Sequence, residues 1–362
     1  MADRNEAIDV FRAVAVFCVV IIHTEPFLHL TGAGHGIGFV LITVSRFAVP
    51  FFFLVSGYLF AVKITQSEAP NAYYRQYVGK LFKMYLAWQA VYLIYDAATF
   101  QVGGAHTYRQ AMADVQAMGL TELVKRPIGM LYYGLYSSGY QLWYLTSLIL
   151  SISIVYLFHK RGAIKLLAAS SLLLHLAGIA GGSYLGLFPR DFMARDALFL
   201  GLFYTMLGYA FHRYREPIRS KLQGKAKPLL LILLLSLGTE LAERTLIAAW
   251  FDTERGDYFL STIVLSSALF LLLTLRPEIG RGSVLVKMGK QAAGIYLIHF
   301  LYINGTYLVL ETNRLSGLRE TWIWDILFTP CVIVLSYVSY TGLQAMKRSL
   351  GVIKKTRERS IA

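Results

Sequence analysis

Charged residues are scarce in this chain of 362 residues. They make up 15% of the sequence, whereas hydrophobic residues make up 56%. Soluble domains carry closer to a quarter of charged residues, and a mean hydropathy of +0.52 is too high for a soluble protein of this length. The polar stretches between the apolar runs are too short for a soluble catalytic domain. Any chemistry must therefore lie among membrane-embedded helices.

Cysteine is almost absent. Cys18 and Cys331 are the two cysteines of the chain, and each lies inside an apolar run. This excludes a disulfide framework and a cysteine-based metal site. Spacings typical of histidine or carboxylate metal ligands are also missing, so we expect no metal cofactor.

Ten long apolar runs follow one another along the chain, and a membrane-spanning helix needs about 20 apolar residues. We therefore predict an all-α, polytopic membrane protein that forms one domain over residues 1–362. The predicted helices lie near 9–29, 39–62, 81–100, 141–158, 163–180, 195–212, 228–249, 257–275, 290–310 and 321–346.

The net charge of +14 comes from basic residues in the short loops between apolar runs. With ten crossings, most of the 35 lysines and arginines fall on the side that also holds both termini. Cytoplasmic loops are enriched in lysine and arginine, so we predict that both termini are cytoplasmic. This distribution explains the charge without nucleic acid, which we do not expect as a partner. Composition leaves the oligomeric state open.

Three ionisable residues interrupt the first apolar run: Asp9, Arg12 and His23. Arg12 and His23 are eleven residues apart, which places them on one helix face about 16 Å apart along the axis. Asp9 can pair with Arg12 one turn away. Histidine transfers protons near neutral pH, so this face is a candidate catalytic stripe. A snorkelling arginine and a hydrogen-bonded histidine explain the same spacing equally well.

Later runs contain further candidates. The second carries Arg46 before Pro50, which we expect to kink the helix, and then Ser56. Arg46 either lines an acceptor pocket or belongs to ordinary helix packing. His299 in the ninth run is either a second proton-transfer group or a structural hydrogen-bonding residue.

Tyrosines gather in the longest predicted outer connection, roughly 101–140. Either they form an interfacial aromatic belt, or they stack against sugar rings. These residues are Tyr132, Tyr133, Tyr136 and Tyr140.

The residues resemble a known family, the acyltransferase family 3 membrane proteins. That family has Arg, ten residues and then His in its first helix, matched here by Arg12 and His23, with an acidic residue at the position of Asp9. The VPFFFLVSGYLF segment at 49–60 after Arg46, the Leu-Trp-Tyr-Leu segment at 142–145 and the GIYLIH segment at 294–299 also match. Gln141 departs from the pattern, because many members have histidine there. Without an appended soluble domain, the chain is most similar to the enterobacterial-common-antigen O-acetyltransferase type.

The resemblance implies a bacterial inner-membrane enzyme that moves an acetyl group from cytoplasmic acetyl-CoA to a hydroxyl of a cell-surface glycan or its lipid-linked precursor. His23 would act as general base, and Arg12, oriented by Asp9, would hold the donor. Arg46, Trp143 and His299 are candidate substrate contacts. Ser56 is a further one, and it or His23 could instead carry the acyl group in a covalent intermediate.

Other functions remain open at this point. A polysaccharide or small-molecule exporter would also suit ten helices with interior charges, although paired broken helices and repeat halves are lacking. Succinyl-CoA could replace acetyl-CoA as donor. A membrane sensor or scaffold has no specific support.

Overall fold

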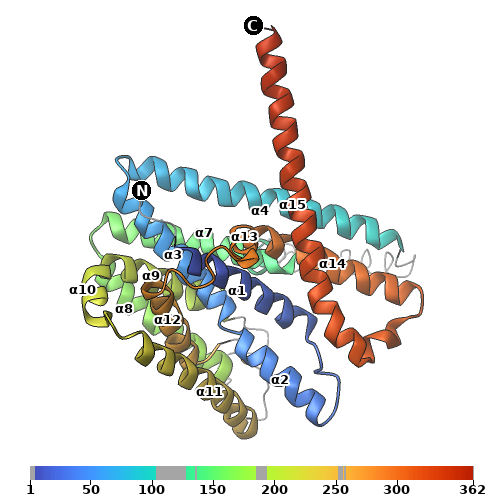
Figure 1. Cartoon of the computed structure of the whole chain (residues 1–362), viewed down its shortest axis with the longest axis horizontal. Coiled ribbons are helices and arrows are strands. Elements are labelled where there is room, and N and C mark those ends of the chain that lie inside the picture. The colour runs from blue at the N-terminus through green and yellow to red at the C-terminus, as the bar shows by residue number, and fades with distance from the viewer. Residues whose placement is uncertain are drawn as a thin grey trace.

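The structure is a computed structural model that describes residues 5–102, 128–134, 137–184, 194–251, 256 and 258–361. All regular structure in these ranges is helical, as predicted (Figure 1). The α-helices are α1 (Glu6–Thr24), α2 (Ala33–Ser45), α3 (Ala48–Gln66), α4 (Pro70–Val102), α7 (Trp143–Lys160), α8 (Ile164–Gly178), α9 (Leu202–Arg213), α10 (Arg215–Leu222), α11 (Ala226–Phe251), α12 (Leu260–Leu275), α13 (Val284–Lys290), α14 (Ala292–Thr312) and α15 (Trp322–Ile361). Short helical turns add η1 (Gly129–Tyr133), η2 (Tyr140–Leu142), η3 (Ile179–Tyr184), η4 (Ala197–Gly201) and η5 (Ser316–Glu320).

Each of the ten predicted runs contains helix, and six stretches of the described chain are long and apolar enough to cross a membrane. These stretches are Glu6–Thr24, Ala33–Gln66, Tyr140–Lys160, Ile164–Tyr184, Ala292–Thr312 and Trp322–Ser349. The chain is thus a multi-pass membrane protein by helix length and composition. Helix α12 has 16 residues and α9 has 12, and α11 carries Glu240, Glu243 and Arg244 in its apolar stretch. The number of ten crossings and the cytoplasmic placement of both termini stay predictions.

The second predicted run is not one continuous helix. Helix α2 ends at Ser45 and α3 begins at Ala48, so the chain breaks at Arg46 and Phe47. The prediction of a kink at Pro50 is wrong, because the helix is interrupted upstream of the proline, at Arg46 and Phe47. Pro50 occupies the first turn of α3, where its missing N–H costs no helical hydrogen bond.

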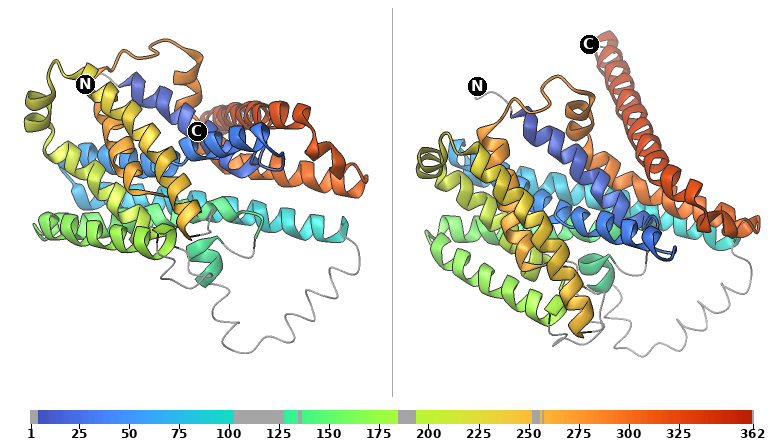
Figure 2. Two further views of the ribbon diagram at one scale, coloured as in Figure 1. Left: turned by 90° about the horizontal axis from the view of Figure 1, so that it is seen from below. Right: turned by 60° about the horizontal axis from the view of Figure 1, so that its bottom comes forward.

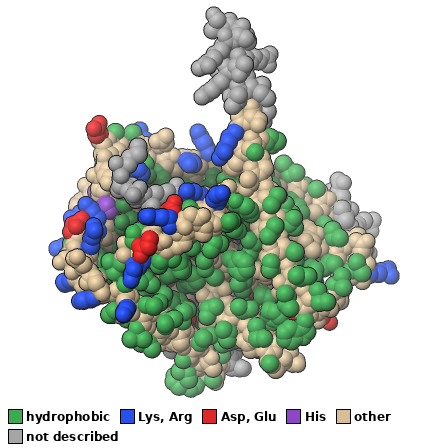
Figure 3. Space-filling model, viewed as in Figure 1, with side chains coloured by type: hydrophobic (Ala, Val, Ile, Leu, Met, Phe, Trp, Pro, Cys, Tyr) green, Lys and Arg blue, Asp and Glu red, His purple; other side chains and the backbone are tan. Residues whose placement is uncertain are grey.

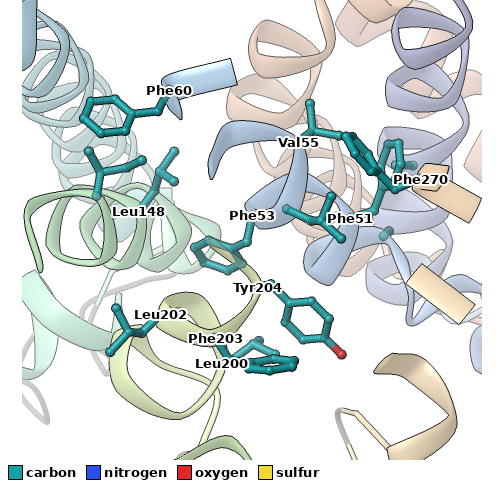
Figure 4. Packing of buried hydrophobic residues seen from close by; sticks show 14 of the residues in the cluster. Phe51, Phe53, Val55, Phe60, Leu148, Leu200, Leu202, Phe203, Tyr204 and Phe270 are labelled. Atoms are coloured by element: carbon teal, nitrogen blue, oxygen red, sulfur yellow. The ribbon is translucent and has the colours of Figure 1, made fainter. Parts of the chain in front are cut away.

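Helices α3 and α9 cross at two glycines, and their backbones come into direct contact. A Cβ at Gly57 would overlap the Thr205 carbonyl, and one at Gly208 would overlap the Leu54 carbonyl. Small residues at such crossings allow close helix packing in membranes. Around the crossing, Phe51, Phe53 and Tyr204 are completely buried in the apolar core shown in Figure 4.

Helix α1 contacts α3 on one side and α13 and α14 on the other, while α11 and α12 lie side by side. In Figure 1, α1 lies near the centre of the view, and the three views show that α15 projects beyond the bundle at its C-terminal end (Figure 2). In Figure 3 the lysine and arginine side chains gather near the start of α1 and the base of the projection, and hydrophobic side chains cover most of the remaining visible face. We call the region where these lysine and arginine side chains gather the basic end.

Candidate active site

Helix α1 presents the predicted catalytic stripe to the protein interior. Its first turn is capped by Asn5, whose side chain accepts a hydrogen bond from the Ile8 N–H at 3.2 Å. Arg12 donates to Asp9 at 3.3 Å, which confirms the predicted pairing. Arg12 lines a cavity, and His23 lies against rings of α14, so both side chains face inward rather than toward lipid.

A cavity of about 1440 Å³ enters the bundle from the basic end. Five basic residues line it, from α1, α3, α10 and the loop after α12: Arg12, Lys63, Arg215, Arg219 and Arg276. Glu216 and Glu278 pair with Arg215 and Arg276, each at a distance of 3.2 to 3.3 Å. The cations outnumber the acids on this lining, so the cavity entrance attracts anions.

The inner part of the cavity is aromatic. Ser56, Tyr77, Tyr144 and Tyr296 line it, together with Leu297. The hydroxyls of Ser56 and Tyr144 are 3.4 Å apart, and the rings of Tyr144 and Tyr296 meet edge to face with centroids 5.4 Å apart. Ser56, predicted as a substrate contact, therefore lies on the wall of this cavity.

His23 lies just beyond this aromatic segment. Its ring centroid is 4.7 Å from that of Phe300, 5.5 Å from that of His299 and 6.5 Å from that of Tyr140. The side chain of His23 is half-buried, as are Phe300 and Tyr140. His299 is one turn along α14 from Tyr296, so the chain of rings connects the cavity with His23.

His299 itself is completely buried. Its Nδ1 lies 2.6 Å from the Tyr296 carbonyl oxygen, which only accepts hydrogen bonds, so Nδ1 carries the proton. The predicted structural hydrogen bond of His299 is thus present. The structure adds what the sequence could not show, namely the contact of His299 with His23 across 276 residues of sequence.

A network of buried hydrogen bonds holds this part of α14 in place. The side-chain amide of Gln141 donates to the Tyr92 hydroxyl at 2.6 Å and to the Leu297 carbonyl at 3.3 Å. Tyr92 donates to the same carbonyl at 2.7 Å, and the Tyr296 hydroxyl donates to the Gln141 carbonyl. Gln141 therefore ties α4, η2 and α14 together beside His299, which gives the residue that departs from the family pattern a structural place.

Arg195 is a residue of this region that the motifs did not indicate. Its guanidinium carbon lies 5.0 Å from the Tyr140 ring centroid and 5.7 Å from that of Trp143. The Tyr140 ring in turn faces His23, so Arg195 is separated from His23 by this one ring. Trp143, predicted as a substrate contact, is buried and lies under this cation. A charged pair, Arg195 and Asp196, at the start of the sixth predicted run was the available signal.

Arg46 lies elsewhere. It follows α2 at the break, and its charge acts on Glu240 of α11. Glu240 is buried and accepts a hydrogen bond from Thr262 at 2.7 Å, while Arg244 donates to Thr43 at 2.6 Å. The role of Arg46 in the acceptor pocket stays a prediction.

The tyrosines of the long connection lie in two different places. Tyr140 faces His23, whereas the Tyr132 hydroxyl donates to Asp196 at 3.0 Å and Tyr133 packs against Tyr132. Tyr136 lies outside the described residues. Within the described ranges, no cluster of three or more histidine, cysteine or acidic side chains could hold a metal ion.

Comparison with known proteins gives a family match. The family model described as an acyltransferase domain matches residues 5–341. A serine/alanine racemase of Enterococcus gallinarum is 27% identical over 88% of this chain and 44% of its own length. An amino-acid racemase of Enterococcus faecalis is 24% identical over 98% of this chain and 48% of its own length. The chain thus spans about half the length of these curated relatives. No solved structure matches.

Proposed function

The chain belongs to the acyltransferase 3 family, and from this we propose that it is an O-acyltransferase of a bacterial inner membrane. Its donor is acetyl-CoA on the cytoplasmic side, and its acceptor is a hydroxyl of a cell-surface glycan or the lipid-linked precursor. The cavity that leads from the basic end to the ring chain of Tyr144, Tyr296, His299 and His23 carries this proposal.

The lining of the cavity suits an acyl-CoA from end to end. The basic entrance matches the phosphates of the donor, because arginine binds phosphate through charge and paired N–H donors. The apolar and aromatic interior matches the uncharged arm and the thioester. Arg12 pairs with Asp9 and lines the same cavity, and these two observations support its proposed role in binding the donor.

Just beyond the aromatic segment of the cavity, His23 removes the proton of the acceptor hydroxyl as general base. The hydroxyl oxygen then attacks the thioester carbonyl carbon, the carbon–sulfur bond breaks, and the departing sulfur takes up the proton as a thiol. Ser56 lines the same cavity and is the alternative carrier of the acyl group in a two-step transfer.

The acceptor approaches His23 from the side opposite the cavity. The half-buried rings of Tyr140 and Phe300 lie beside His23, and the guanidinium of Arg195 lies over the Tyr140 ring. Aromatic rings beside a polar group are suited to the apolar faces and hydroxyls of a sugar. The enterobacterial-common-antigen kind of acceptor is proposed from the sequence resemblance alone.

Both relatives carry the name of a racemase, and each is about twice as long as this chain. The acyltransferase model covers nearly the whole region that they share with this chain. We therefore propose acyl transfer, rather than racemisation, for the part that this chain represents.

The test uses membrane vesicles of two orientations and acetyl-CoA labelled in the acetyl group. We expect label to enter glycan in inside-out vesicles, which present the cytoplasmic face, and not in sealed right-side-out vesicles. Membranes from cells that lack the protein give the background, and unlabelled succinyl-CoA, which we expect to compete only weakly, tests the donor.

An exporter would move the glycan across the membrane without incorporating label, and that result would end the proposal. Stronger competition by succinyl-CoA than by unlabelled acetyl-CoA would keep acyl transfer but change the donor. Label uptake in right-side-out vesicles would reverse the orientation.

A further inference from the structure

One nitrogen of His299 is left without a hydrogen-bond partner. Because Nδ1 donates to the Tyr296 carbonyl, the other ring nitrogen, Nε2, carries a lone pair and can only accept. This Nε2 is completely buried and has no protein partner in the described part of the chain. Buried polar atoms almost always have a partner, so an unpartnered acceptor beside a reactive group indicates a functional role.

The nearest imidazole is that of His23. The two ring centroids are 5.5 Å apart, with an angle of 33° between the ring planes. An N–H···N hydrogen bond with nitrogens about 3 Å apart would place two imidazole centroids at roughly 5 Å. The observed separation is slightly longer, and His23 is only half-buried. A rotation of the His23 ring that turns one of its N–H groups toward His299 would close this gap and form the hydrogen bond.

We propose that His299 is a positioning residue for His23: its Nε2 accepts a hydrogen bond from one His23 nitrogen and so directs the lone pair of the other nitrogen toward the acceptor hydroxyl. This inference rests on the proposed acyl transfer. The order of groups is the Tyr296 carbonyl, His299, His23 and then the hydroxyl. A backbone carbonyl and an imidazole thus take the place that a carboxylate holds in many catalytic triads.

His23 is the side chain that carries the transferred proton between the hydroxyl and the sulfur. His23 takes the hydroxyl proton as the new oxygen–carbon bond forms, and it returns this proton to the sulfur when the carbon–sulfur bond breaks. His299 keeps its own proton on Nδ1 throughout, because the Tyr296 carbonyl holds it there. The acceptor bond from His299 also stabilises the positive charge that His23 carries between the two transfers.

Two substitutions separate this role from a purely structural one. In His299→Asn, the short amide can still donate to the Tyr296 carbonyl, but it does not reach the position of Nε2. In His299→Gln, the longer side chain can place an acceptor oxygen near that position. If His299 positions His23, the His299→Gln variant must be more active than the His299→Asn variant. If His299 has only a structural role, the order of the two activities is reversed.

His175 offers a matched control. It is also completely buried, and its Nδ1 lies 2.7 Å from the Phe199 carbonyl oxygen. Its neighbours are the rings of Phe203, Tyr204 and Tyr258, and its Nε2 likewise lacks a protein partner. His175→Asn and His175→Gln therefore repeat the same chemical changes away from His23.

The experiment measures steady-state acyl transfer by the purified full chain in lipid nanodiscs, with labelled acetyl-CoA and extracted glycan. We expect His299→Asn to lower kcat about 100-fold with little change in the KM for acetyl-CoA. His299→Gln should recover about a tenfold part of that loss. Neither His175 variant should change kcat by more than about twofold.

Wild-type kcat in His299→Asn, or a higher kcat in Asn than in Gln, would overturn the positioning role. Failure of acyl transfer in the wild-type protein would instead remove the proposed function. The two failures are distinct, because the first requires an active wild-type protein that His23→Ala inactivates.

Discussion

Two clusters of polar side chains lie between the helices of this apolar bundle, and they differ in what their hydrogen bonds do. The first contains His23 and His299 between α1 and α14. The second lies between α11, α12 and α2, where Glu243 accepts from the N–H groups of Leu260 and Ser261, and Arg244 donates to Thr43. We call them the histidine cluster and the carboxylate cluster.

The hydrogen bonds of the carboxylate cluster hold helices together. Glu243 satisfies two N–H groups in the first turn of α12, and the Glu240 carboxylate accepts from Thr262 in the same turn. Helix ends inside a membrane need such partners, because lipid supplies none. The histidine cluster, by contrast, adjoins the cavity through Tyr296. Ionisable groups within a membrane protein therefore indicate function only when a substrate can reach them.

The largest expected effect concerns the histidine cluster. His23→Ala should lower kcat about 10²- to 10⁴-fold, because the general base is lost. The thermal stability should stay near that of the wild type, since the His23 ring is half-buried. Labelled acetyl transfer and thermal unfolding in the same nanodisc preparation test both statements. Retained activity at a matched protein level would remove His23 from catalysis.

A smaller effect, of the opposite kind, is expected in the carboxylate cluster. Glu243→Ala removes the acceptor of the Ser261 N–H and leaves the Leu260 N–H only the Tyr184 hydroxyl at 3.5 Å, so it should destabilise the protein by about 1–3 kcal/mol. Activity per folded molecule should not change. Glu243→Gln, which keeps one acceptor oxygen, is the matched variant and should lose less stability. Unfolding measured by denaturant titration tests this prediction. A loss of activity without a loss of stability would mean that the carboxylate cluster also acts in catalysis.

The smallest effect is expected at the cavity entrance. Arg219 is exposed on α10 and lines the cavity, so Arg219→Gln should raise the KM for acetyl-CoA about two- to fivefold without changing kcat. High salt should reduce the difference, because it screens exposed charges. Lys221→Gln, an exposed residue of the same helix outside the cavity lining, is the control. Equal KM values for both variants would place the donor elsewhere.

Much of this protein follows from local sequence. The apolar runs determine the helices, because a chain in lipid must satisfy its backbone hydrogen bonds within each segment. The pairing of Asp9 with Arg12 needs only a spacing of three residues on one helix, and the structure contains it. The shared face of Arg12 and His23 also follows from their spacing of eleven residues, whereas the structure shows that this face turns inward.

Tertiary structure decided the rest. The break at Arg46, the cavity lined from distant helices, the place of Arg195 beside Tyr140 and the approach of His299 to His23 have no counterpart in sequence spacing. The periodicity of a helix states which of its faces is buried, but not which other helix lies against that face. Packing contacts between residues far apart in the chain set that choice, and they bring the two imidazoles together.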